Sequence, residues 1–259
     1  MAASRSLFLV VITFMCCMFF HQNSSHAAES PLRVAISGPY APFAIVGEDG
    51  TLSGFDVDIA EAICKVLERK CTIENMEFDE IIPAIVAGKV DIAVADMGPT
   101  PERRKLVDFT DRYYRSASIF IGRSGMTTDL APEKMKGLRV GAQLSSLQHE
   151  YLVEHYSGFI QIVTDSSYDA VFEMLKKGDV DLILSDGLPG YAYLSSENGK
   201  GLESMGSPDF PVNEKGWCCI TLAKNKEQLR EAINNAIQTI RRNGEYDRIN
   251  RKYFDFMIY

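Results

Sequence analysis

Ile81–Asp96 reads IIPAIVAGKVDIAVAD and Val171–Asp186 reads VFEMLKKGDVDLILSD, and the two stretches share one pattern. In each, an apolar helical segment ends at a glycine, a Val-Asp pair follows, and a short apolar run closes on an aspartate. A second echo precedes each copy, because Leu-Arg-Val occurs at both 32–34 and 138–140. An apolar run after a helical segment is typical of a buried parallel strand reached through a crossover helix. The repeat therefore predicts two similar α/β lobes.

The aspartates that close the two copies give the first indication of function. In open α/β sheets, ligands bind beyond the carboxyl ends of the parallel strands. Asp96 and Asp186 fall at equivalent strand ends, one in each lobe, and we expect them to face each other across a cleft. The pattern favours a two-lobed receptor for a small polar molecule.

The N-terminal residues have the composition of a cleaved secretory signal peptide. Arg5 precedes an apolar stretch at 7–20, and a polar segment then ends in Ser25-His26-Ala27-Ala28. The apolar stretch is shorter than the roughly 20 residues that a membrane-spanning helix needs. Cleavage after Ala27 sets Ser25 at the upstream position that requires a small residue. We therefore assign 1–27 to the signal peptide, with cleavage after residue 28 as the alternative, and expect a soluble exported protein.

Four cysteines follow this segment. In an oxidising compartment Cys64 and Cys71 are expected to form a disulfide, because Cys64 lies late in a helical segment and Cys71 opens the next extended run. Cys218 and Cys219 are adjacent in an apolar run that is typical of a strand, so their side chains should point to opposite faces. We expect one buried thiol and one elsewhere, not a disulfide between neighbours.

Composition argues against two kinds of binding. The formal net charge of −8 disfavours nucleic acid, which requires a basic surface, but is compatible with cationic small ligands. A metal site is not expected, since no cysteine pair has zinc spacing and the surroundings of His149 and His155 are poor in ligands.

Helical and extended segments fill out the two lobes. Apolar residues at helical spacing predict a helix at 56–67 that Asp56 caps, and Asp79 is expected to cap the helix before Gly88. A strand is predicted at 90–95, and a C-terminal helix at 227–242.

Two segments should connect the lobes. An extended apolar stretch at 113–122 leaves the first lobe, and 208–217 is the expected return. These crossings assign 28–115 and 218–259 to lobe I, and 116–217 to lobe II with its connectors. Paired crossings form a hinge, which permits closure around a ligand.

Several motifs occur in an order that is specific to one family. They are Tyr40-Ala41-Pro42-Phe43, Gly54-Phe55-Asp56-Val57-Asp58, Thr100-Pro101-Glu102-Arg103 before Val107-Asp108-Phe109, then Asp186, and Lys252-Tyr253-Phe254-Asp255-Phe256. With this set, which spans nearly all of the mature chain, the protein resembles the periplasmic solute-binding proteins of polar amino-acid import systems, a family that includes the lysine/arginine/ornithine-binding protein. The resemblance implies a bilobal periplasmic protein that closes on a free amino acid and delivers it to an ABC-transporter permease in the membrane. We expect a monomer without a cofactor.

The resemblance assigns roles at matching positions. Arg103 matches the arginine that binds the ligand carboxylate, and its planar guanidinium suits a bidentate bond. Gly98 and Ser146 match positions that add hydrogen bonds to the same carboxylate. Asp186 matches the acid that receives the α-ammonium. A closing site must pair both charges of an amino acid, because a buried unpaired charge is costly.

Further matching positions surround the ligand's side chain. Tyr40 and Phe78 match aromatic walls, Gln148 lies in a turn of the second lobe that faces the cleft, and Ala95 completes the set. Each residue also has an ordinary alternative, since arginines are usually exposed and aromatic residues commonly belong to the core.

Two positions depart from the relatives that select basic amino acids. Ser37 stands where those relatives have an acidic residue that pairs the ligand's distal cation, and Asp96 stands at a position of small hydroxyl residues. Asp96 has either become the counter-ion for a cationic side chain or joined the cage around the α-ammonium. Lys, Arg, His or an amino-acid derivative is favoured over acidic ligands.

Two other functions stay open. The cyclohexadienyl dehydratases resemble this family and use a cleft carboxylate as a general acid, a role within reach of Asp96. A sensor domain that reports to a membrane partner is disfavoured, because no membrane-spanning segment follows. The combination of Arg103 and Asp186 favours capture of an amino acid without catalysis.

Overall fold

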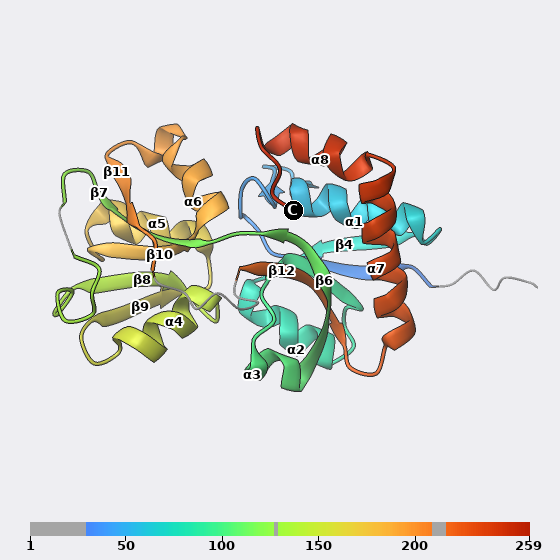
Figure 1. Cartoon of the computed structure of the whole chain (residues 1–259), viewed down its shortest axis with the longest axis horizontal. Helices are drawn as coiled ribbons and strands as arrows, with labels where there is room; N and C mark the ends of the chain where they lie inside the picture. The colour runs from blue at the N-terminus through green and yellow to red at the C-terminus, as the bar shows by residue number, and fades with distance from the viewer. Residues whose placement is uncertain (1–29, 127–128, 209–215) are drawn as a thin grey trace, which may run out of the picture.

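A computed structural model describes residues 30–126, 129–208 and 216–259. Two five-stranded sheets with flanking helices form two lobes that lie side by side (Figure 1). The strand orders are β4-β1-β5-β12-β6 in lobe I and β11-β7-β10-β8-β9 in lobe II. The two-lobed α/β fold predicted from the repeat is thereby confirmed.

Lobe I combines parallel strands with an antiparallel edge. β1 pairs in parallel with β4 and β5, whereas β12 runs antiparallel to β5 and β6. The strands are β1 (Leu32–Ile36), β4 (Cys71–Asn75), β5 (Ile92–Met97), β6 (Val107–Arg115) and β12 (Trp217–Ala223), with a hairpin of β2 (Ile45–Val46) and β3 (Leu52–Ser53). The helices are α1 (Phe55–Val66), α2 (Ile81–Val86), α3 (Pro101–Leu106), α7 (Glu227–Arg242) and α8 (Glu245–Tyr253), with one 3₁₀ turn at Phe78–Glu80.

Lobe II repeats this plan. β8 pairs in parallel with β9 and β10, whereas β7 runs antiparallel to β10 and β11. The strands are β7 (Ser118–Arg123), β8 (Arg139–Gln143), β9 (Gln161–Asp165), β10 (Leu182–Asp186) and β11 (Leu202–Gly206). The helices are α4 (Leu147–Tyr156), α5 (Tyr168–Lys177) and α6 (Gly187–Leu194), with a 3₁₀ turn at Glu197–Gly199.

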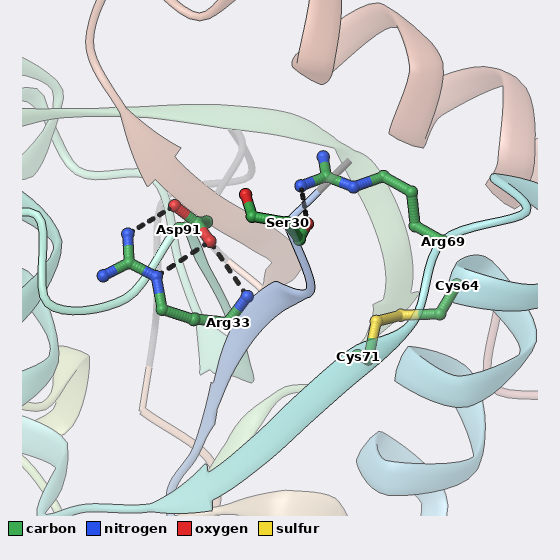
Figure 2. The surroundings of a disulfide bond; sticks show 6 residues. All are labelled: Ser30, Arg33, Cys64, Arg69, Cys71 and Asp91. Carbon is green, nitrogen blue, oxygen red and sulfur yellow. Dashed lines mark hydrogen bonds and ion pairs between the residues drawn. A yellow bond between two sulfur atoms is a disulfide. The ribbon is translucent and has the colours of Figure 1, made fainter. Parts of the chain in front are cut away.

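The repeated Leu-Arg-Val and Val-Asp motifs meet in each lobe through the same ion pair. In lobe I the guanidinium of Arg33 lies 2.7 Å from one carboxylate oxygen of Asp91, and the Arg33 amide donates to the other oxygen at 2.9 Å (Figure 2). In lobe II, Arg139 makes the same two bonds to Asp181, again at 2.7 and 2.9 Å. The sequence repeat is therefore a structural repeat that ties β1 to β5 and β8 to β10.

The predicted disulfide joins Cys64 near the end of α1 to Cys71 at the start of β4 (Figure 2). It closes a loop with a sequence separation of 7 residues. The prediction is confirmed.

The first crossing between the lobes lies at Ser116-Ala117, between β6 and β7 (Figure 1). The return runs from β11 to β12, and 209–215 of the expected connector, like the expected signal peptide, lies outside the described residues. Within the described ranges, no helix is both long and apolar enough to span a bilayer.

The predicted cap of the first long helix is wrong. Gly54, not Asp56, occupies the N-cap of α1, with φ of 127°. A side chain at Gly54 would collide with the backbone carbonyl of Phe43, because its Cβ would lie 2.2 Å from that oxygen. Asp56 is instead buried inside lobe I and accepts a hydrogen bond from the Tyr113 hydroxyl at 2.9 Å.

Two other local predictions also need correction. Asp79 makes no capping bond, because it lies within the 3₁₀ turn that leads into α2. The strand predicted at 90–95 begins two residues later, at Ile92, because Asp91 lies in a bend where its carboxylate binds Arg33, and it continues to Met97. Asp96 therefore lies inside β5, one residue before its end.

The neighbouring cysteines of β12 are both buried, not one buried and one elsewhere. Their side chains alternate as expected: Cys218 belongs to the main hydrophobic cluster and Cys219 to a second cluster with Phe78 and Met97. Both faces of β12 are covered, because a hydrophobic cluster packs against each of them.

Candidate ligand-binding site

A cavity of about 1100 Å³ lies between the two lobes. Its walls include the strand ends of both sheets, which agrees with the expected position beyond the carboxyl ends of parallel strands. Nine of the predicted site residues line it: Ser37, Tyr40, Phe78, Ala95, Asp96, Arg103, Ser146, Gln148 and Asp186. The structure thus brings together residues from both halves of the sequence.

The tenth predicted residue, Gly98, lies beside the cavity wall. Its carbonyl accepts a hydrogen bond from Arg103 Nη1 at 2.8 Å. A Cβ at Gly98 would lie 2.4 Å from Leu147 Cδ1 of lobe II. The glycine therefore lets the two lobes approach each other closely, and its carbonyl helps to position the Arg103 guanidinium.

Arg103 spans the gap between the lobes. The N-cap hydroxyl of Thr100 starts α3 and sets Arg103 in its first turn. From there Nη2 donates to the carbonyl of Ser145 in lobe II at 2.7 Å and lies 3.4 Å from a carboxylate oxygen of Glu150. The guanidinium lies 5.6 Å from the centre of the Phe78 ring. Burial lowers the pKa of Arg103, while Glu150 and Asp96 oppose that change, so the group keeps its charge.

Asp96 occupies an uncommon backbone conformation for a residue other than glycine, with φ of 52°. Its carboxylate accepts a 2.5 Å hydrogen bond from the Tyr40 hydroxyl, and its amide donates to the Tyr113 oxygen at 3.1 Å. Burial raises the pKa of Asp96, and the neighbouring Cys218, Tyr114 and Tyr40 groups act in the opposite direction. The carboxylate is held in a fixed position at the floor of the cavity.

Asp186 closes the cavity from lobe II. It ends β10 and caps α6, because its carboxylate accepts from the Leu188 amide at 3.2 Å. The Ser116 hydroxyl donates to the same oxygen at 2.5 Å. Burial, together with the charge of Asp96, raises the pKa of Asp186 well above its usual value. Because the charge of Asp96 disfavours ionisation of Asp186, a cation bound between the two carboxylates would be favoured.

The remaining contacts of lobe II fix the roof of the cavity. Ser146 caps α4 and accepts from the His149 amide at 3.1 Å. Gln148 is buried and donates to the Ser118 hydroxyl at 2.9 Å. Across the cleft, the rings of Tyr40 and Tyr168 meet edge to face with centroids 4.6 Å apart. The Tyr40–Tyr168 contact, like the bond from Arg103 to Ser145, therefore joins the two lobes across the cleft.

Sequence reasoning missed many lining residues, and one group of them lies next to the crossings: Arg115, Ser116, Ser118, Trp217 and Cys218. They belong to the start of β12 and to the junction of β6 with β7. We call this side of the cavity, where the chain crosses between the lobes, the rear wall. Only the prediction that the two crossings form a hinge beside the cleft could have indicated that these residues line the cavity.

The fold and the cavity define a bilobal binding protein whose lobes meet over a small polar site. Residues 32–256 match the bacterial extracellular solute-binding proteins, family 3, and the chain belongs to this family. The family resemblance inferred from the motifs is confirmed.

Similar proteins include two bacterial receptors. The L-arginine-binding protein of Pseudomonas aeruginosa is 31% identical over 90% of this chain and 91% of its own length. The lysine/arginine/ornithine-binding periplasmic protein of Escherichia coli is 30% identical over 91% of this chain and 92% of its own.

Solved structures show the same arrangement. An ancestral arginine-binding protein bound to arginine aligns with a TM-score of 0.81 and 32% identity, over 88% of this chain and 99% of that one. The ancestral amino-acid-binding protein AncCDT-1, a precursor of cyclohexadienyl dehydratase, aligns with a TM-score of 0.76 and 25% identity, over 87% and 95%.

Proposed function

We propose that this chain is a periplasmic receptor that closes on a free cationic amino acid and delivers it to the permease of an ABC transporter. The observation that carries the proposal is a charge pattern: two carboxylates, Asp96 and Asp186, and one buried guanidinium, Arg103, line one cavity. An amino acid with one carboxylate and two cationic groups complements all three charges. Arginine, lysine and ornithine have this set, and similar proteins are named for binding these amino acids.

In the proposed complex each charged residue has one partner. Arg103 binds the ligand's carboxylate and exchanges part of its bonding to Ser145 and Glu150 for it. Asp186 receives the α-ammonium. Asp96 pairs the distal cation or shares the α-ammonium, while Tyr40 and Phe78 enclose the side chain.

The remaining assignments complete the proposal. We assign 1–27 to the export signal, 28–115 and 218–259 to lobe I, and 116–217 to lobe II with its connectors. Ser37, Ala95, Gly98, Ser146 and Gln148 are the proposed neutral contacts. The receptor acts as a monomer, since one chain supplies both walls of the cavity.

The first test is calorimetric titration of the refolded protein, stripped of carried-over ligand, with the twenty common amino acids and ornithine. We expect arginine, lysine, ornithine or histidine to bind and acidic amino acids to fail. Asp96→Asn should weaken cationic ligands selectively if Asp96 pairs the distal cation, and should weaken every bound amino acid if it joins the α-ammonium cage. Glu231→Gln, an exposed change on α7, serves as the matched control. Failure of all amino acids to bind would refute the proposal.

A second candidate function is general-acid catalysis of the cyclohexadienyl dehydratase type. It rests on Asp96, whose pKa is raised by burial, and on the similarity to AncCDT-1. Incubation of the purified protein with prephenate tests it. Turnover that Asp96→Asn abolishes would favour the enzyme, whereas an unchanged substrate supports the receptor.

A further inference from the structure

The cavity extends beyond the residues proposed to hold an amino acid. Its volume of about 1100 Å³ lies just above the range of about 300–1,000 Å³ that is typical of sites for drug-sized ligands. The proposed anchors of lobe I stand after β1, on β5 and at α3. The rear wall, made by the ends of β12 and β6, has no part in the proposed amino-acid site.

The order of the strands in lobe I sets the distance between this rear wall and Asp96 on β5. β12 lies next to β5, and β6 lies next to β12. Trp217 and Arg115 are direct partners in the register of β12 and β6, and both line the cavity. Because neighbouring strands are about 4.8 Å apart, Arg115 stands about 10 Å from the strand of Asp96. That separation leaves room for a substituent larger than a hydrogen on the bound amine.

The rear wall has the chemistry of an anion subsite. Two guanidinium groups lie near the indole of Trp217, with Arg112 5.3 Å and Arg115 6.0 Å from its ring centre. Arg115 is exposed to the cavity and forms no ion pair within the part of the chain that the structure describes. The Arg112 Nε is buried and has no hydrogen-bond partner among the described residues. An arginine fork against an aromatic face suits a carboxylate.

Different parts of the cavity therefore favour ligand groups of opposite charge. Asp96 and Asp186 require a cation at the floor, Arg103 requires an anion at one side, and Arg115 with Trp217 offers a place for a second anion. A single free amino acid satisfies only the first two requirements.

From this arrangement, which rests on the proposed function, we infer that Arg115 and Trp217 form a second anion subsite and that the preferred ligand is an amino acid with an additional carboxylate attached at its amine. An Nα-carboxyalkyl amino acid has this chemistry. Its amine stays basic and meets the aspartates, its own carboxylate meets Arg103, and the added carboxylate reaches Arg115.

The test compares three probes by calorimetric titration: L-arginine, Nα-methyl-L-arginine and Nα-carboxymethyl-L-arginine. We expect the carboxymethyl compound to bind about tenfold more tightly than the methyl compound, as a charge-assisted hydrogen bond would give. Arg115→Gln should reduce this ratio to near one. Arg242→Gln, an exposed change on α7 outside the cavity, should preserve the ratio.

The outcomes distinguish failure of the proposed anion subsite from failure of the proposed amino-acid receptor function. Binding of arginine with a carboxymethyl-to-methyl ratio near one in the unaltered protein overturns the subsite and leaves the receptor intact. A ratio that persists in Arg115→Gln overturns the role of Arg115, because the arginine then only stacks on Trp217. Failure of all three probes, with another amino acid bound, overturns the inferred ligand class; failure of every amino acid overturns the receptor itself.

Discussion

The Tyr40 hydroxyl donates a 2.5 Å hydrogen bond to the Asp96 carboxylate, so an aromatic wall of the cavity also positions one of its charges. The bond favours the ionised form of Asp96 and counteracts the effect of burial on its pKa. Tyr40 thus has two functions in the proposed site: its ring faces Tyr168 of lobe II, and its hydroxyl maintains a binding charge.

Tyr40→Phe should weaken the binding of a cationic amino acid by about tenfold, since one hydrogen bond to a charged group is lost. Without that bond the pKa of Asp96 should rise further, so the loss of affinity on acidification should begin at a higher pH. Titrations from pH 5 to 8 would check both effects. Tyr191→Phe, at an exposed position on α6, is the control. An unchanged affinity and pH profile would show that the hydroxyl has no role in binding.

Asp186→Asn should stabilise the ligand-free protein at pH 7. It should also abolish the stabilisation that a bound ligand gives. The folded state raises the pKa of Asp186 through burial and the charge of Asp96, so it binds the proton more tightly than the unfolded state. Stability therefore falls as pH rises from about 3.9 through the raised pKa, and the charged form costs stability at neutral pH. Asparagine keeps the capping bond to α6 without this cost.

Thermal unfolding of the Asp186→Asn variant is expected to show a Tm about 2–4 °C higher at pH 7, with no further rise on adding ligand. The difference from the unaltered protein should shrink as pH approaches 4. Asp255→Asn, at an exposed position, should change neither quantity. A lower Tm at pH 7 would show that ionised Asp186 stabilises the fold.

Asp181→Asn should destabilise lobe II, with the opposite pH dependence. Hydrogen bonds from Arg139 lower the pKa of Asp181, so its contribution is present above the unfolded pKa and is lost as pH falls through the lower folded value. The pair is partly exposed, and we expect a cost of about 1 kcal/mol at pH 7 in urea unfolding. The matched change in lobe I is Asp91→Asn, which should have a similar cost. A large effect in only one lobe would contradict the equivalence of the two ion pairs.

Replacement of Cys64 and Cys71 by alanine should lower the free energy of unfolding by about 2 kcal/mol, because the disulfide closes a short loop. Ligand affinity should be unaffected, since neither residue lines the cavity. Urea unfolding and calorimetry of the double variant would measure the two quantities separately. A loss of affinity in a folded variant would mean that the α1–β4 connection influences the site.

The repeat at 81–96 and 171–186, with the Leu-Arg-Val echo before each copy, predicts the lobes correctly because both halves contain the same contacts: Asp91 pairs with Arg33, and Asp181 pairs with Arg139. Local pattern fails at Asp56, where a glycine that fits closely under the Phe43 carbonyl decides the start of the helix. It also fails to place Trp217 and Arg115 in the cavity. Their position depends on β12 entering the sheet between β5 and β6, and no short stretch of sequence encodes that pairing.

The position of β12 in the sheet of lobe I also sets the order in which the two sheets can be completed during synthesis. The strands of lobe II occupy 118–206 and are complete before 217–223 is synthesised, whereas lobe I lacks an internal strand until then. While β12 is absent, β5 and β6 have no partner on their facing edges and the two crossings cannot both exist. During synthesis, the sheet of lobe I therefore stays incomplete after every strand of lobe II has been made. The topology that joins the two lobes by two crossings thus leaves lobe I incomplete until a strand from the C-terminal part of the chain is available.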